Sequence, residues 1–290
     1  MTSAARRSSG AASSNLDGAA PGIRVAGPLA PSFDSVTPVR EPARPVEPAV
    51  RIEHVGKRFG EGPLVLDDIN LDIAPGEFVC LLGASGCGKS TLLNLIAGLD
   101  RPTAGHIETP AAGSAVMFQE SALMPWLTAR RNVELALRLR GVPRAERRSK
   151  ALALLDTVNL ADAAEKRPHE LSGGMRQRVA LARALAQDRP VLLMDEPFAA
   201  LDAITRDLLH EELERVWRAT GRTIVFVTHN VREAARLGER VILLSSRPGR
   251  VAGEWRIAKT AGRRIESPEV AALSIEITDQ LRKEIRRNAA

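Results

Sequence analysis

The stretch Gly83-Ala84-Ser85-Gly86-Cys87-Gly88-Lys89-Ser90-Thr91 decides the fold, because it matches the pattern G-x-x-x-x-G-K-[ST] in full. A continuous apolar run at 77–82 precedes it, as expected of a strand covered on both faces. Residues 89–97 then have the pattern of a helix that Gly98 ends. In a strand, glycine-rich loop and helix arranged in this order, backbone N–H groups converge on phosphate oxygens. We therefore expect a nucleotide-binding site here.

Particular side chains of this loop carry the predicted phosphate chemistry. Lys89 is expected to reach the β- and γ-phosphates, and Ser90 to ligate Mg²⁺. The glycines allow close approach of the backbone, and the dipole of the helix start adds positive potential. Cys87 has two interpretations, a thiol activated by the helix N-terminus or a tolerated small residue. We prefer the second, because no neighbouring sequence resembles redox machinery.

Two acidic residues end a second predicted buried strand, Val191–Asp195. Carboxylates at the C-terminal end of a strand face the ligand crevice of an open α/β sheet. We expect Asp195 to hold Mg²⁺ through water and Glu196 to polarise the attacking water. Two acids at a strand end are usually only solvated, so this prediction depends on the loop at Gly83–Thr91.

The rest of the pattern predicts a two-lobed α/β domain. Early strands are predicted at 50–55 and 67–73, and further buried strands at 223–228 and 241–245. Helices are predicted at 128–140, 144–158, 174–187, 203–219 and 268–287. We expect a disordered tail at 1–48, rich in Ala, Pro and Ser, a nucleotide-binding domain at 49–255 with a helical subdomain at about 120–188, and a helical extension at 256–290.

Composition is that of an ordinary globular chain, with 44% hydrophobic and 26% charged residues among 290. No run approaches the roughly 18 apolar residues of a membrane span, and residues 1–30 lack the apolar stretch of a secretory signal. Arg6, Arg7 and nearby serines leave a transit peptide as the alternative. Two cysteines do not indicate a disulfide framework, which favours a reducing compartment.

A net charge of +6 and a pI near 10.0 raise the question of nucleic-acid binding. The alternative is a basic surface, or contact with an anionic membrane face. We prefer this alternative, because the arginines are spread along the chain, aromatic residues make up only 3%, and no motif that reads RNA or DNA is present.

A further motif, Leu171-Ser172-Gly173-Gly174-Met175-Arg176-Gln177-Arg178, resembles the signature of ATP-binding cassette (ABC) ATPases. A turn residue, two glycines and a helix make a second anion site at a helix start. The resemblance spans about residues 50–255 and implies a P-loop NTPase (RecA-like) core with an antiparallel β subdomain and an α-helical signature subdomain. It also implies that Leu171, Ser172, Gly173, Gly174 and Gln177 cap the ATP held by the opposite subunit.

The resemblance assigns roles to four more positions. Phe59 corresponds to the aromatic residue that stacks on adenine, although a core phenylalanine is the alternative. Gln119 corresponds to the glutamine that ligates Mg²⁺ and contacts the attacking water. Asp202, in Ala200-Leu201-Asp202, belongs to the loop that crosses the dimer interface, and His229 corresponds to the switch histidine at the γ-phosphate.

Within the family, the chain is similar to importer ATPase subunits, since it has one cassette, no fused membrane domain and no long coiled-coil insertion. The stretches 117–127, 197–202 and 246–250 are similar to the nitrate/sulfonate/taurine group. This resemblance implies import of a small anion. Aliphatic sulfonate is our first choice of transported solute and taurine is our second. Trp126 is either a core residue or part of a surface that receives a permease helix.

The resemblance implies a homodimer that binds ATP and Mg²⁺ at the cytoplasmic face of the cell membrane. Two integral-membrane permease subunits and an extracytoplasmic solute-binding protein are the implied partners, with no nucleic acid. Two rival interpretations are a soluble ABC ATPase acting on nucleic acid and a non-catalytic regulatory P-loop protein. Glu196 and His229 argue against the second.

Overall fold

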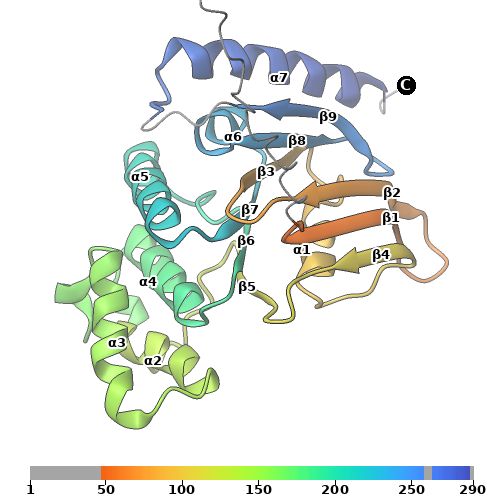
Figure 1. Ribbon diagram of the computed structural model, residues 1–290. Helices are drawn as coiled ribbons and strands as arrows, with labels where there is room; N and C mark the ends of the chain where they lie inside the picture. Colours follow the sequence, from red (N-terminus) through yellow and green to blue (C-terminus); the bar gives the residue numbers. More distant parts are fainter. Residues whose placement is uncertain (1–46, 258–262, 288–290) are drawn as a thin grey trace, which may run out of the picture. The chain divides into compact units, whose positions relative to one another are not determined.

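The predicted buried strands lie at the centre of one mixed sheet, with strand order β5-β6-β7-β3-β8-β9 (Figure 1). The computed structural model describes residues 47–257 and 263–287. Within them the strands of this sheet are β3 (Phe78–Gly83), β5 (Ser114–Met117), β6 (Val191–Asp195), β7 (Thr223–Thr228), β8 (Arg240–Leu244) and β9 (Val251–Arg256). All pairs are parallel except β8 with β9. Strands β3, β7 and β8 are buried throughout, as the continuous apolar runs require.

A second sheet is antiparallel, with strand order β2-β1-β4. Its strands are β1 (Val50–Arg58), β2 (Leu64–Ile73) and β4 (Ala104–Glu108). Alternation of apolar and polar residues in β1 and β2 turns one face inward, where Ile52 and Ile69 pack in one core with helix α1 (Lys89–Ile96) and with Val79 of the central sheet. Strand β4 escapes prediction because most of its residues are exposed, so it has no apolar alternation.

Three helices form a separate layer beside β5 and β6, as Figure 1 shows for α2, α3 and α4. Their bounds are Ala129–Leu139, Arg144–Thr157 and Gly173–Ala186, each within two residues of the prediction. Short 3₁₀ turns η1 (Ala161–Ala163) and η2 (Pro168–Glu170) connect α3 to α4. This layer shares a core with the central sheet through apolar side chains such as Leu137, Leu155 and Leu181.

The remaining helices cover the central sheet. They are α5 (Ala203–Thr220), α6 (Val231–Leu237) and α7 (Pro268–Arg287). Helix α7 has the predicted bounds and lies along β9 in Figure 1, where Trp255 Nε1 donates to Glu276 Oε1 over 2.8 Å. Neither α6 nor β9 was predicted, because α6 is too short for a helical period and β9, which has no buried residue, has no apolar run.

The predicted α/β class is confirmed by these sheets and helices. In the described part of the chain no helix combines the length and the apolar character that crossing a membrane requires. Most of the predicted tail, residues 1–46, lies outside the described residues. The parallel topology brings the carboxyl ends of β3, β6 and β7 to one edge, and the predicted site residues follow these ends.

Candidate functional site

The loop Gly83–Thr91 joins β3 to α1 and wraps around its own lysine. Lys89 Nζ donates to the backbone oxygens of Gly83 and Ala84, over 2.9 and 3.0 Å, and the side chain is buried. Gly88 caps α1 with a φ of +98°, a left-handed conformation that favours glycine. The Cys87 side chain is buried, and burial raises the pKa of its thiol. This opposes a thiolate and supports the interpretation of Cys87 as a tolerated small residue.

The start of α1 and the end of β6 meet through Ser90 and Asp195. Ser90 Oγ donates to Asp195 Oδ1 over 3.1 Å. Burial raises the pKa of the Asp195 carboxyl and the nearby charge of Glu196 adds to this, while the Ser90 hydrogen bond acts in the opposite direction. Hydroxyl and carboxylate oxygens are the hard ligands that Mg²⁺ prefers.

The Ser90–Asp195 pair therefore fits a magnesium ion. Among residues 47–257 and 263–287 there is no group of three or more His, Cys, Asp or Glu side chains that could hold a metal. A magnesium ion bound with phosphates needs only one or two protein carboxylates, so this finding agrees with the pair.

Glu196 and His229, which follow β6 and β7, face each other. His229 Nδ1 lies 3.0 Å from Glu196 Oε2. Glu196 N continues the sheet by donating to Val227 O over 3.0 Å, although Glu196 has a φ of +43°, which is rare for a residue with a side chain. Strained backbone of this kind is concentrated at functional sites. Two residues predicted from separate motifs are thus brought together.

The loop after β5 carries Gln119 and is held by side chains of α4. Gln177 Nε2 donates to Gln119 O over 2.8 Å, and the Arg183 guanidinium donates to the oxygens of Ser121 and Ala122 over 2.7 and 2.6 Å. The Gln119 side chain itself is exposed. Trp126, further along the loop, is 68% exposed, so its interpretation as a core residue is wrong.

The signature residues form the start of α4. Ser172 is the N-cap, and its Oγ accepts a hydrogen bond from Met175 N over 3.3 Å. Leu171 is buried, whereas Ser172 is exposed. The Gln177 side chain points into its own chain, toward Gln119, so any effect on a partner's nucleotide is indirect. Asp202 caps α5, where its Oδ1 accepts from Thr205 N over 2.9 Å, and this hydrogen bond lowers its pKa.

Phe59 directly follows β1 and is 54% exposed, so it is not a core phenylalanine. Lys57 Nζ lies 4.7 Å from the centroid of its ring. Lys57 is itself fixed by Asp100, with an Nζ to Oδ1 distance of 2.8 Å. The Lys57 ammonium therefore holds the Phe59 ring in place, and about half of the side chain stays exposed to solvent.

A buried network beside the site was not predicted. Thr228 Oγ1 donates to the Glu233 carboxylate, whose Oε1 lies 2.5 Å from His210 Nε2. His210 is fully buried, and the Phe198 ring centroid lies 5.6 Å from that of His210. The network thus connects the segment after Glu196 with the residue before His229. A single histidine in an amphipathic helix gives no sequence signal for it.

Comparisons with known proteins agree with this arrangement. The family model described as "ABC transporter" matches residues 66–199. The chain is 44% identical over 241 residues to the taurine import ATP-binding protein TauB of Chromobacterium violaceum, covering 78% of this chain and 92% of TauB. It is 50% identical over 211 residues to the nitrate import ATP-binding protein NrtD of Synechocystis sp., covering 70% of this chain and 78% of NrtD.

A solved structure, the dimeric ATP-binding cassette MJ0796 in a post-hydrolysis state with ADP and Pi, superposes with a TM-score of 0.63. That cassette is 37% identical in sequence and is covered completely, against 73% of this chain. A second dimeric structure of the same cassette gives a TM-score of 0.64. The predicted P-loop NTPase fold is confirmed by these superpositions together with the family match.

Proposed function

We propose that this chain, which belongs to the ABC transporter ATP-binding proteins, is the ATPase subunit of an importer for a small anion. Membership makes the chain an ATP-binding ATPase. The observation that carries the proposal is its similarity to both a taurine and a nitrate import ATP-binding protein over most of their length. The cargo class follows from these relatives, because this subunit acts on ATP and not on the cargo.

Within that class, aliphatic sulfonates are our first choice, on the residues around Gln119 and Trp126. Taurine and nitrate have equal support from the named relatives. Taurine carries a sulfonate group, and nitrate shares the single negative charge. A purified permease complex in vesicles, loaded with a candidate solute-binding protein, would distinguish them through uptake of each anion at equal concentration.

The chemistry proposed for the site combines its geometry with the roles that the family resemblance implies. Lys89 and the loop amides bind the phosphates, while Ser90, and Asp195 through water, would hold a magnesium ion. A bound magnesium ion would supply positive charge that stabilises the negative charge developing on the transferring phosphoryl group. Glu196 polarises the attacking water, and His229, 3.0 Å from its carboxylate, keeps that carboxylate oriented and contacts the γ-phosphate. Gln119 contacts the magnesium ion and the attacking water, and Phe59 stacks on adenine.

Half of each site is proposed to come from a second copy of the chain. The exposed Ser172 and the glycines at the start of α4 offer backbone N–H groups to the partner's ATP, and Asp202 lies at the interface. The dimeric MJ0796 cassette supports this arrangement. Two permease subunits are proposed to bind at the exposed Trp126. The dimer would then lie at the cytoplasmic face of the membrane, with a solute-binding protein on the other side.

The test is the variant Glu196→Gln, which keeps the size of the side chain and removes its basicity. We expect ATP binding to persist, turnover to fall by about 10²-fold or more, and ATP to trap a dimer detectable by light scattering. Lys89→Ala is the matched control, because it should lose binding and dimer together. Normal turnover in Glu196→Gln would show that the base is assigned incorrectly.

A second arm tests the shared site and the rival class. Ser172→Arg should stop hydrolysis while the single subunit still binds ATP, and loss of binding would count against a site shared between subunits. ATPase activity should also rise with the permease and not with DNA. Stimulation by DNA alone would favour the nucleic-acid ATPase instead.

A further inference from the structure

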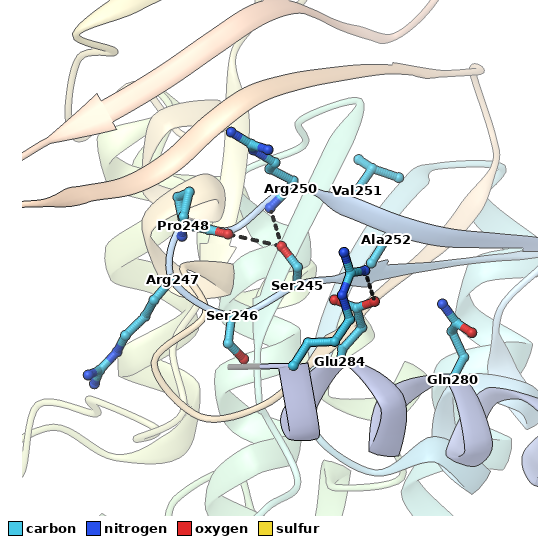
Figure 2. A pocket seen from close by; sticks show the side chains of 10 residues that line it. Ser245, Ser246, Arg247, Pro248, Arg250, Val251, Ala252, Gln280 and Glu284 are labelled. Atoms are coloured by element: carbon cyan, nitrogen blue, oxygen red, sulfur yellow. Dashed lines mark hydrogen bonds and ion pairs between the residues drawn. The ribbon is translucent and has the colours of Figure 1, made fainter. Parts of the chain in front are cut away.

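The segment between β8 and β9, Ser245–Arg250, is a compact loop held by its own hydrogen bonds (Figure 2). Ser245 Oγ donates to Pro248 O and accepts from Arg250 N, both over 2.9 Å. Ser245 N donates to Arg250 O over 2.8 Å. Hydrogen bonds within the loop therefore help to stabilise its conformation, in addition to contacts with neighbouring segments.

The same loop is fixed against the nucleotide loop and β2. Gly249 N donates to Val65 O over 2.8 Å, and Asp67 N donates to Gly249 O over 3.0 Å. A Cβ on Gly249 would lie 2.3 Å from Cys87 O, so the two backbones touch at a distance that only glycine allows. Arg250 Nε donates to Asp67 Oδ2 over 3.0 Å. These contacts give the loop a rigid position relative to Gly83–Thr91.

Arg247 stands out among the arginines of this loop. Its Nη2 lies 3.8 Å from the position that a Cβ on Gly86 would take, so the guanidinium is beside the nucleotide loop. The side chain is exposed and, within the described residues, makes no hydrogen bond or ion pair. Arg250 and Arg287, which line the same cleft, are paired with Asp67 and Glu284. In Figure 2 the Arg247 side chain points away from Arg250.

The backbone at Arg247 is strained, with a φ of +42°. A residue with a side chain is strained in this conformation, and such residues cluster at ligand-binding sites. Glycine would remove the strain, so the arginine side chain is kept at this position despite a conformational cost. An unpaired guanidinium beside the converging amides of a phosphate-binding loop has the chemistry of an anion ligand.

We propose that Arg247 is a further nucleotide-binding residue, whose guanidinium binds the phosphate chain of the ATP held by Gly83–Thr91. This inference rests on the function proposed above. The loop Ser245–Arg250 supplies a second cation from outside the nucleotide loop, complementing the buried Lys89. The planar guanidinium can bind two phosphate oxygens at once, which an ammonium cannot.

The experiment compares the affinity of the full chain for ATP and ADP by titration calorimetry in the presence of magnesium. Arg247→Gly keeps the loop conformation accessible and removes the guanidinium, and we expect ATP to bind about tenfold more weakly. Arg247→Lys should recover only part of the affinity, because it keeps the charge and loses the planar fork. Thermal unfolding of Arg247→Lys should match the parent, and Arg247→Gly should unfold at no lower temperature than the parent, which excludes a loss of folding as the cause.

Arg138→Ala, at an exposed position of α2, is the control with the same loss of charge, and its affinity should not change. Arg247→Gly with parental affinity for ATP, alongside a Lys89→Ala variant that no longer binds, would overturn the role of Arg247 and leave the proposed function intact. In that case the guanidinium would serve a protein contact. If Lys89→Ala also bound ATP normally, the nucleotide site itself would be overturned.

Discussion

Gln177 Nε2 donates a 2.8 Å hydrogen bond to the backbone oxygen of Gln119, which ties the signature helix to the loop that follows β5. Gln177 is buried and lies in the same helix that Ser172 caps. A movement of the helix start therefore reaches Gln119 through a rigid element and one hydrogen bond. This bond connects the half of the site proposed to act on the partner's ATP with the half that acts on its own.

Gln177→Leu removes this bond with little change of volume. We expect kcat to fall about three- to tenfold, because Gln119 loses its support, while the isolated subunit binds ATP as before. Steady-state ATPase kinetics and calorimetry measure the two quantities. Gln187→Leu, in the residue that caps the same helix, is the control and should leave both unchanged. A raised KM with an unchanged kcat would contradict the coupling.

The Thr228–Glu233–His210 network leads to a second prediction. Thr228→Val keeps the shape of the side chain but removes the hydroxyl that donates to Glu233 and accepts from Asn230 N over 3.0 Å. Because His229 lies between Thr228 and Asn230, we expect its orientation to loosen and kcat to fall about tenfold with little change in KM. The free energy of unfolding should fall by about 1 to 2 kcal/mol, because a buried oxygen of the Glu233 carboxylate loses its hydrogen-bond donor.

The control for this variant is Thr223→Val, at the other end of β7. Thr223 Oγ1 accepts from Gly76 N over 2.9 Å, so the substitution also removes one hydrogen bond. It should lower stability in urea denaturation without lowering kcat. Equal kcat losses in the two variants would mean that the network only stabilises the fold.

Much of the site was predictable because its residues belong to contiguous motifs. The pattern Gly83–Thr91 dictates a strand, loop and helix, and two acids after a buried strand must lie at a sheet edge. The meeting of Ser90 with Asp195 follows from the parallel topology once both strands are placed. These inferences need only local patterns and the rule that parallel strands end at one edge.

Other parts depend on contacts that no local pattern carries. The burial of His210 is set by Glu233 and Phe198, which belong to other segments of the chain. The bond from Gln177 to Gln119 joins residues 58 apart in sequence. Helix α6 is only seven residues long, and its one sequence signal is the cap Asn230, which accepts from the backbone N–H groups of Arg232 and Glu233. Periodicity cannot detect a helix of two turns.

Gly174 provides a third prediction, about the contact between α4 and α5. A Cβ at Gly174 would lie 2.5 Å from Thr205 Cγ2, closer than packing allows. Gly174→Ala should therefore lower the free energy of unfolding by about 1 to 3 kcal/mol. Adding Thr205→Ser removes the opposing methyl group and should restore most of that loss. Urea denaturation of the single and double variants measures it, and additive losses would show that the clash is not the cause.

Glu254 gives a prediction about pH. Arg240 Nη2 donates to Glu254 Oε2 over 2.8 Å, and its Nη1 donates to Asp72 O over 2.6 Å, so the buried guanidinium joins β9 to the second sheet. The hydrogen bond from Arg240 lowers the pKa of Glu254 below its ordinary value near 4.5. The ionised carboxylate thus stabilises the folded state above that ordinary value, and this contribution is lost as the pH falls through the lowered pKa.

Glu254→Gln removes the charge and keeps the shape. At pH 7 we expect the variant to be less stable by about 0.5 to 1 kcal/mol, a modest value because Glu254 is partly exposed to solvent. As the pH falls below about 4.5 the unfolded parent binds a proton first, and the difference should narrow toward zero as the pH passes through the lowered pKa of Glu254 in the folded state. Urea denaturation from pH 8 down to about pH 3 measures this, with Glu61→Gln, in an exposed turn, as the control. If the difference stays constant with pH, the packing of the Glu254 side chain stabilises this edge of the sheet, and the interaction of its charge with Arg240 does not.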